Sequence, residues 1–495
     1  MWWCWMKRHY LITVIIFLGF LLRLYRLTDQ SIWLDEALSI LYSQQPLSHV
    51  LGLKTTTPPL YYLLLNFWMQ IIGNSEFSTR LLSAFLGTIA IYVTYLLGSL
   101  IFNKKTGIVA ALLLAISPIH IYYSQETRTY SLFFLLTLLS MYFYVKMKNG
   151  CSKKYVAGYI TVSVLLLYSH LYSLFIVIAQ NIDKFITHDF KQLKKLQSWI
   201  LIQVIIIIFY IPWLIALYEI IAMKSYSWIP RPNLLILFPL PYKFIAGEVF
   251  SFYGLLLILI FFYVGFKYPF KSVKKESFLL ISWLLIPVVT PLIYSLMFTP
   301  VFIIKYSIVA SFSLLLIVAY SLFNMNTLKK TGFLILIVLF SCLALYVQQS
   351  TTTKDSWREI SDFIRSNMQD DDKIILINSY EVIPFAYYFK PVCFKSPNIY
   401  ECSNIEGIYQ YNTVEQASKI NAERIWLILS KDQYIENIQD ILNVIYSRYN
   451  IIKSREYLVN QNSAFFNKFH KYLVENNLVR GKYNKVRVRH LMRKS

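Results

Sequence analysis

Two adjacent carboxylates, Asp35 and Glu36, stand in the segment SIWLDEALSI, shortly after the first long apolar run of the chain. A carboxylate in such a place can accept a proton, bind a metal ion or pair with a cation. The simpler interpretation is that both acids occupy the first turn of a helix and stabilise its dipole. Ionisable residues further along the chain favour the chemical interpretation.

Four of these residues stand at turns between later apolar runs or at the mouth of one. They are Glu126 and Arg128 in YYSQETRTYS, His170 in LYSHLYS and Lys305 in IIKYSIVA. Ionisable groups at membrane depth are energetically costly and usually mark function. Carboxylates suit a base or a metal ligand, and cations suit binding of a phosphate leaving group. Each also has a structural interpretation: an ion pair within one turn for the glutamate and the arginine, a satisfied polar group for the histidine and an interfacial side chain for the lysine.

The elements that must position these residues are membrane spans. Of the 495 residues, 57% are hydrophobic and only 15% are charged, and apolar runs of span length recur over residues 1–350. Basic residues precede the first run, but no small-residue cleavage site follows it, so we expect an uncleaved first span. We predict a polytopic α-helical membrane protein with about eleven transmembrane helices. The predicted spans are 10–27, 79–101, 107–123, 129–146, 155–171, 172–188, 198–220, 248–267, 277–298, 305–324 and 332–348.

The net charge of +22 indicates topology rather than nucleic-acid binding. The basic clusters fall between the predicted spans, and placing all of them on one side makes that side cytoplasmic. The loop 28–78 and everything after about residue 350 then lie outside. The apolar segment 58–73 is short for a span, so we place it in the outer interface. In this topology all six candidate residues lie at the outer face.

The last part of the chain changes character. Helix and strand patterns alternate over residues 350–475, which predicts a small extracytoplasmic α/β domain after a transmembrane domain of residues 1–349. Residues 476–495 are expected to form a basic tail, either solvated or attracted to anionic headgroups or phosphorylated glycans. Cys393 and Cys402 fall in the predicted α/β domain, where a disulfide between them is left open.

Several stretches, taken in order, resemble one family. They are LRLYRLTDQSIWLDEALS, TPPLYYLLLNFW, TRLLSAFLGTIAIYVTYLLGSLIF, LLLAISPIHIYYSQETRTYSL, LLLYSHLYSLFIVIAQN and KDSWREISDFI. Together they resemble bacterial GT-C glycosyltransferases similar to the protein O-mannosyltransferases, the aminoarabinose transferases of lipid A and the rhizobial core-sugar transferases. The resemblance covers most of the chain and is strongest over residues 20–180.

The resemblance implies a GT-C fold and transfer of a sugar from a polyprenyl-phosphate donor to an envelope acceptor at the outer face of the plasma membrane. The acceptor would be a glycolipid, lipopolysaccharide or a protein, and a single inverting displacement is expected. In this interpretation Asp35 matches the family's catalytic acid and acts as the base, Glu36 orients the acceptor or assists a metal, and Glu126 matches a second acidic position. The expected phosphate-binding residues are Arg128, His170 and Lys305.

Two departures from the family pattern leave metal binding open. Thr57-Pro58-Pro59 stands where the family often has His-Pro-Pro, and Asn66 replaces a frequent second histidine. We assign no cofactor, and a divalent metal remains an alternative. A transporter or flippase of a lipid-linked sugar is the alternative function, since it would also have many spans and buried charges. Charges gathered at one face, without a convincing internal repeat, favour the transferase.

Overall fold

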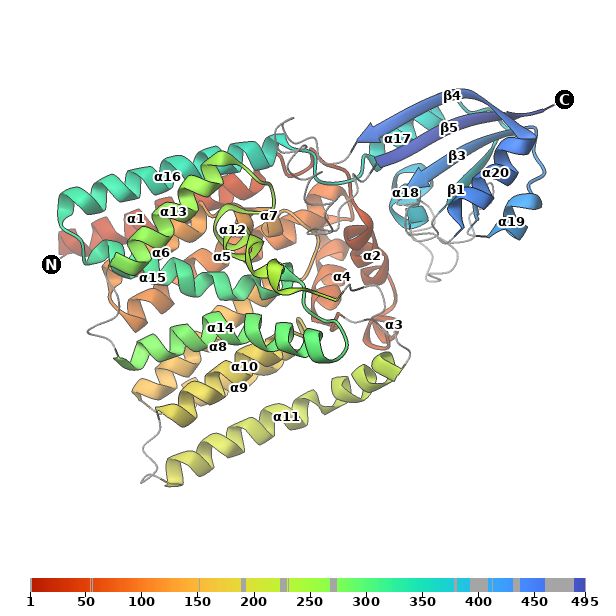
Figure 1. The fold of residues 1–495 in the computed structure, drawn as a ribbon. Coiled ribbons are helices and arrows are strands. Elements are labelled where there is room, and N and C mark those ends of the chain that lie inside the picture. The colour runs from red at the N-terminus through yellow and green to blue at the C-terminus, as the bar shows by residue number, and fades with distance from the viewer. Residues whose placement is uncertain are drawn as a thin grey trace. The chain divides into compact units, whose positions relative to one another are not determined.

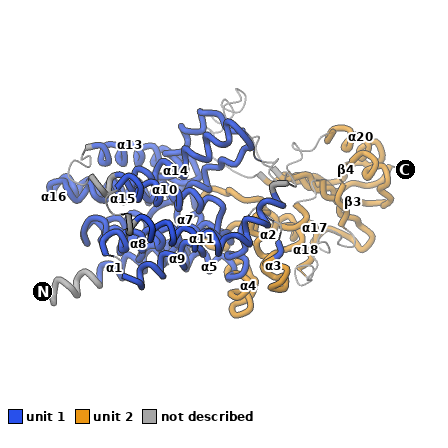
Figure 2. Tube along the Cα trace, turned by 90° about the horizontal axis from the view of Figure 1, so that it is seen from below, with its two compact units in different colours: residues 1–25, 52–64, 78–349 blue, residues 26–51, 65–77, 350–495 orange. Residues whose placement is uncertain are grey.

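The computed structural model of the chain divides into two compact units (Figure 2). Unit 1 consists of residues 1–25, 52–64 and 78–349, and unit 2 of residues 26–51, 65–77 and 350–495. The residues that the structure describes are 2–53, 55, 57–150, 152–187, 193–222, 229, 231–267, 274–377, 381–391, 408–411, 413–430, 437–458 and 485–494.

Unit 1 is helical (Figure 1). Many of its apolar side chains are exposed, most clearly along the long helix α11, as expected for helices that contact lipid. Its helices are α1 (Trp2–Leu24), α5 (Glu76–Ile101), α6 (Lys104–Ala115), α7 (Pro118–Ser124), α8 (Tyr130–Asn149), α9 (Lys153–Leu167), α10 (Ser173–Ile186), α11 (Leu193–Ala222), η1 (Leu234–Leu237), α12 (Pro239–Ala246), α13 (Phe252–Lys267), α14 (Lys274–Met297), η2 (Ile304–Ala310), α15 (Ser311–Phe323) and α16 (Thr327–Ser350). Helix α4 (Leu60–Ile72) begins in unit 1 and ends in unit 2.

The predicted count of about eleven spans is not confirmed. Each predicted range overlaps a helix, but only six helices among the described residues are long and apolar enough to cross a membrane, or seven if the bent pair α6–α7 is one span. Helices α9 and α10, for example, have 15 and 14 residues, and at 1.5 Å per residue such helices are shorter than a hydrocarbon core of about 30 Å. An apolar run therefore predicts where a helix lies better than where it ends.

The bend between α6 and α7 follows from one dipeptide. Pro118 is the first residue of α7, and a proline disfavours helical backbone angles in the residue before it. Ser117 is accordingly extended, at φ −68° and ψ 118°, and the two helices meet at 60°. The predicted span 107–123 is therefore broken, and α7 leads directly into the segment that carries Glu126 and Arg128.

Unit 2 contains a five-stranded sheet of order β2-β1-β3-β5-β4. β1 pairs in parallel with β2 and β3, whereas β5 pairs antiparallel with β3 and β4. The strands are β1 (Lys373–Ile377), β2 (Ile408–Gln410), β3 (Arg424–Ser430), β4 (Tyr449–Leu458) and β5 (Lys485–Arg493). The helices of this part of the chain are α17 (Trp357–Arg365), α18 (Val382–Phe389), α19 (Val414–Ser418) and α20 (Ile438–Arg448).

Successive side chains of a strand point to opposite faces of the sheet, so alternate residues pack into two different hydrophobic cores. Ile374 and Leu376 of β1 lie in one core with α17 and α18, whereas Ile375 and Ile377 lie in the other with α19 and α20. The sheet is thus covered by helices on both faces.

Two sequence-based boundaries differ from the structure. The predicted basic tail is not a tail at residues 485–493, because Val486, Val488 and Leu491 are buried and this segment is strand β5. Residues 26–51, which lie within the predicted transmembrane domain 1–349, belong to unit 2. They carry α2 (Leu34–Ser43) and α3 (Leu47–Leu51), and apolar residues of α2 such as Ile40 pack in the same core as α17 and α18.

Candidate functional site

Asp35 and Glu36 occupy the first turn of α2 in unit 2, so the helix-start interpretation is correct as far as position goes. The two carboxylates nevertheless differ in environment. Glu36 is fully buried, whereas Asp35 is only partly buried. The Ser39 hydroxyl donates to the backbone carbonyl of Asp35, not to its carboxylate, at 2.8 Å.

A buried ion pair explains how Glu36 is accommodated. The Lys354 ammonium donates to Glu36 Oε2 at 2.9 Å, and the lysine side chain is only 7% exposed. A buried carboxylate needs such a cation, because an unpaired buried charge is strongly unfavourable. Lys354 is not among the residues predicted from the sequence, although it begins the segment KDSWREISDFI on which the family resemblance partly rests.

Lys354 is held by the backbone around it. Gln30 Oε1 accepts hydrogen bonds from the backbone N–H groups of Thr353 and Lys354, at 2.8 and 3.0 Å. The Arg358 guanidinium donates to the Thr28 carbonyl at 2.8 Å and forms an ion pair with Glu76. These bonds hold the segment before α17 against the segment before α2. The Lys354 ammonium is thereby positioned to pair with the Glu36 carboxylate.

Glu126 and Arg128 lie in the turn between α7 and α8 of unit 1, and both side chains are buried. The turn is fixed to its neighbours by hydroxyl groups. The Thr129 hydroxyl donates to the Ser169 carbonyl at 2.7 Å, and the Thr127 and Thr79 hydroxyls are 3.1 Å apart. These bonds connect the turn to α5 and to the α9–α10 connection, which carries His170.

Three of the predicted residues surround two tyrosines in unit 1. The Arg128 guanidinium lies 5.9 Å from the centre of the Tyr130 ring, and the Lys305 ammonium lies 5.7 Å from the same ring and 5.8 Å from the Tyr306 ring. The His170 ring lies 4.8 Å from Tyr306 and 6.2 Å from Tyr130. We call these five residues the tyrosine–cation cluster. The structure thus brings Arg128, His170 and Lys305 together, as the shared face predicted.

His170 is oriented within this cluster. Its Nδ1 accepts a hydrogen bond from the Tyr172 backbone N–H at 3.1 Å, and its ring stacks on Phe133 at 4.7 Å. Because Nδ1 is an acceptor there, a proton of the neutral ring resides on Nε2. His170 can therefore present a hydrogen-bond donor from a buried position.

A further acidic residue adjoins the cluster. Glu248 Oε1 accepts a hydrogen bond from the Tyr123 hydroxyl at 2.5 Å, and Glu248 Oε2 pairs with the Lys243 ammonium at 2.5 Å. The Tyr123 ring packs edge-on against Tyr130 at 4.8 Å. Glu248 is not among the residues predicted from the sequence, although no other acidic residue stands between Glu219 and Glu276.

Asn66 and the question of metal binding can be compared with the structure, whereas the cysteine pair cannot. Asn66, where a histidine is frequent, donates from Nδ2 to the Ser43 carbonyl at 2.6 Å, so its side chain closes the turn after α2. Among the described residues, no group of three or more His, Cys, Asp or Glu side chains could hold a metal ion. The predicted cysteine pair, Cys393 and Cys402, lies outside the described residues.

Known proteins resemble this chain in one sequence segment and in the fold. Residues 56–215 match the family model described as dolichyl-phosphate-mannose-protein mannosyltransferase. No curated protein matches the sequence. The structure of ArnT from Cupriavidus metallidurans in the apo state is 10% identical, with 97% of each chain covered and a TM-score of 0.61.

Two further structures share the fold. ArnT from the same organism bound to undecaprenyl phosphate matches with a TM-score of 0.58, at 10% identity and 97% coverage of each chain. The oligosaccharyltransferase AglB from Archaeoglobus fulgidus, in complex with an inhibitory peptide and a dolichol-phosphate, is 12% identical. That match has a TM-score of 0.53 and covers 94% of this chain and 75% of the other. All of these are GT-C glycosyltransferases, and the predicted GT-C resemblance is confirmed in the fold.

Proposed function

Given its GT-C fold, we propose that the chain is a membrane glycosyltransferase that moves a sugar from a polyprenyl phosphate to an acceptor of the cell envelope. The observation that carries the proposal is the tyrosine–cation cluster, in which the Arg128 guanidinium and the Lys305 ammonium both lie close to the Tyr130 ring, at 5.9 and 5.7 Å from its centre. Two cations so placed suit the phosphate that must leave when the sugar is transferred.

The donor class draws support from the structural neighbours. One was determined with undecaprenyl phosphate and another with a dolichol-phosphate, and both ligands are polyprenyl monophosphates. A helical unit with exposed apolar faces suits such a donor, since the tail of the donor can remain in the bilayer while its phosphate reaches the cations of the cluster. We extend this to an active site at the outer face of the plasma membrane, as the distribution of basic residues favours.

The reaction we propose is a single inverting displacement. The acceptor oxygen attacks the anomeric carbon, the bond from that carbon to the phosphate oxygen breaks, and the polyprenyl phosphate departs with the bonding electrons. Arg128 and Lys305 stabilise the charge that develops on the phosphate, and His170 donates a hydrogen bond to it. The acceptor proton goes to the Asp35 carboxylate.

The two acids of α2 differ in burial, and this supports different roles for them. Glu36 is fully buried and forms an ion pair with Lys354, so we propose that it stabilises the start of α2 rather than binding the acceptor. Asp35 is less buried and is the better candidate for a base that must meet a substrate. For Glu126 we propose a role different from the predicted one, binding of sugar hydroxyl groups, and for Glu248 we propose the same role.

Release of the lipid product tests this function without knowledge of the sugar. Purified protein in liposomes receives a panel of polyprenyl-phosphate sugars together with an envelope extract, and free polyprenyl phosphate is quantified by mass spectrometry. We expect its formation with at least one donor, and only when the acceptor extract is present. A protein that moves an intact donor across the bilayer without releasing polyprenyl phosphate would be a flippase, and the proposal would be wrong.

A further inference from the structure

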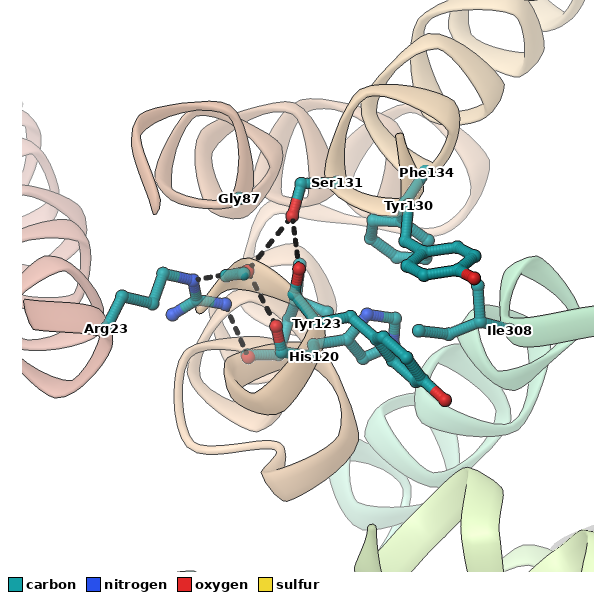
Figure 3. Close-up of a pocket in the computed structure, with 10 residues that line it drawn as sticks. Arg23, Gly87, His120, Tyr123, Tyr130, Ser131, Phe134 and Ile308 are labelled. Carbon is teal, nitrogen blue, oxygen red and sulfur yellow. Dashed lines mark hydrogen bonds between the residues drawn. The ribbon is translucent and has the colours of Figure 1, made fainter. Parts of the chain in front are cut away.

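Arg23, near the end of α1, is a fully buried cation that none of the roles above uses. Its guanidinium donates to the carbonyls of Gly19, Ala115 and Leu114, at 2.8, 3.3 and 3.5 Å. It also lies 3.3 Å from the Ser124 hydroxyl (Figure 3). Among the described residues these are its hydrogen-bond partners, and none of them is a carboxylate.

Two of the backbone partners of Arg23, Leu114 and Ala115, lie at the break between α6 and α7. They are the last two residues of α6, where backbone carbonyls lose their helical i+4 partners, and Ser124 ends α7. The Leu114 carbonyl also accepts from the Ser117 backbone N–H, at 3.3 Å. Unsatisfied carbonyls are especially unfavourable inside a membrane, where water does not replace the missing donors. A guanidinium, with five donors and a permanent positive charge, satisfies such a helix end.

The surrounding chain leaves room for this guanidinium. A Cβ atom on Gly87 would lie 3.0 Å from Arg23 Nε and 2.2 Å from the Ser124 hydroxyl oxygen, and one on Gly19 would lie 3.3 Å from Arg23 Nη1. The cavity beside Arg23, which Tyr123 and Tyr130 also line, has about 10 Å³ of space, room for roughly one water molecule. A side chain at Gly87 would displace the arginine or the end of α7, whereas one at Gly19 would first meet Ile91, at 2.3 Å.

The same end of α1 also holds the residue next to Glu126. The Gln125 side-chain amide donates to the carbonyls of Arg23 and Tyr25, at 3.1 and 2.7 Å. The Ser124 hydroxyl in turn is 3.3 Å from the Ser131 hydroxyl at the start of α8. The end of α1 therefore contacts the residues just before the turn that carries Glu126 and Arg128, and Ser124 links those residues to the start of α8.

We propose that Arg23 is a positioning residue, which closes the broken end of α6 and so holds the α7–α8 turn in the conformation that places Arg128 against Tyr130. The consequence for donor binding rests on the proposed function, but the effect on the turn does not. Arg128 acts on the phosphate, and Arg23 acts only through the backbone that carries it.

Hydrogen–deuterium exchange of the purified full-length protein, without substrate, tests the effect on the turn. Arg23→Met keeps an apolar stem and removes the donors, and Gly87→Ala displaces Ser124 while leaving Arg23 in the chain. We expect exchange in residues 117–129 to rise roughly tenfold or more in both, as lost charge-assisted hydrogen bonds would allow. Exchange in residues 311–323 should stay as in the wild type, and Arg23→Lys should restore part of the protection.

Gly265→Ala is the matched control, since a Cβ there meets only ordinary contacts at 3.7 and 3.9 Å. It should leave exchange in residues 117–129 unchanged. Exchange that rises equally throughout unit 1 in Arg23→Met would show general destabilisation and overturn the proposal. Unchanged exchange in residues 117–129 in both Arg23→Met and Gly87→Ala would overturn it as well.

Donor kinetics provide a second readout. A misplaced Arg128 should raise the KM for the polyprenyl-phosphate sugar about tenfold in Arg23→Met, since small displacements of positioning groups have effects of this size or larger. A loss of folded protein would lower the apparent kcat with an unchanged KM, which would overturn the positioning role. If the wild type transfers no sugar at all, the proposed function is wrong, and the exchange experiment still decides the role of Arg23.

Discussion

Replacing Lys354 with methionine should destabilise unit 2, because the Glu36 carboxylate would remain buried without this cation. The ammonium and Glu36 Oε2 are 2.9 Å apart, and the two side chains are 7% and 0% exposed. At that distance the attraction is about 6 kcal/mol at an effective dielectric constant of 20. Part of this offsets the desolvation of both ions, so the net loss on removing one partner is expected at about 3–5 kcal/mol.

This loss of stability can be measured as a shift in the midpoint of thermal unfolding. For a unit of this size each kcal/mol corresponds to roughly 2–4 °C, so Lys354→Met should lower the Tm of unit 2 by about 6–20 °C. Trp357 and Trp426 are fully buried in unit 2, which makes tryptophan fluorescence a suitable probe in detergent. Lys419→Met is the matched control, because Lys419 pairs with Glu415 at an exposed position where an ion pair contributes less than about 1 kcal/mol.

The double variant Glu36→Gln with Lys354→Met removes both charges and should recover a large part of the lost Tm. The reasoning is refuted if Lys354→Met shifts the Tm no more than Lys419→Met does. It is also refuted if the double variant is as unstable as the sum of its single variants, because the two side chains would then act independently.

Two further predictions concern the donor and the topology. Arg128→Ala and Lys305→Ala should each weaken use of the polyprenyl-phosphate sugar by about 1.5–3 kcal/mol in kcat/KM, and unchanged kinetics in both would remove them from the phosphate site. In a background without native cysteines, an impermeant thiol reagent added to intact cells should label a cysteine at Leu47, which is 60% exposed, and at Glu415, but not at Gly150. Labelling at position 150 would contradict the topology.

The positions of the helices were largely predictable, because long apolar runs dominate the chain. The break within the run 107–123 was not predicted, although Ser117-Pro118 carries the signal for it. In a membrane, buried partners such as Arg23 can satisfy the backbone at such a break, so an uninterrupted apolar run does not require an uninterrupted helix.

The proximity of three candidate site residues could be predicted from their positions between helices. Arg128, His170 and Lys305 each stand where one helix gives way to another, and alternating spans return such positions to the same side of the membrane. Lys354 could not be assigned to Glu36 in this way, since 318 residues separate them and only tertiary packing joins them. The strand β5 was missed because its many basic residues concealed the alternation of Val486 and Val488.

The central claim, that Asp35 is the general base, is tested most directly by the turnover of Asp35→Asn in the sugar-transfer assay. The amide keeps the shape of the side chain and removes its basicity, so turnover should fall about 10²–10⁴-fold. The Tm should stay close to that of the wild type, and Asp29→Asn, an exposed acid in the same segment, should transfer sugar normally. A folded Asp35→Asn protein that transfers sugar at a near-normal rate would show that the acid pair only begins a helix.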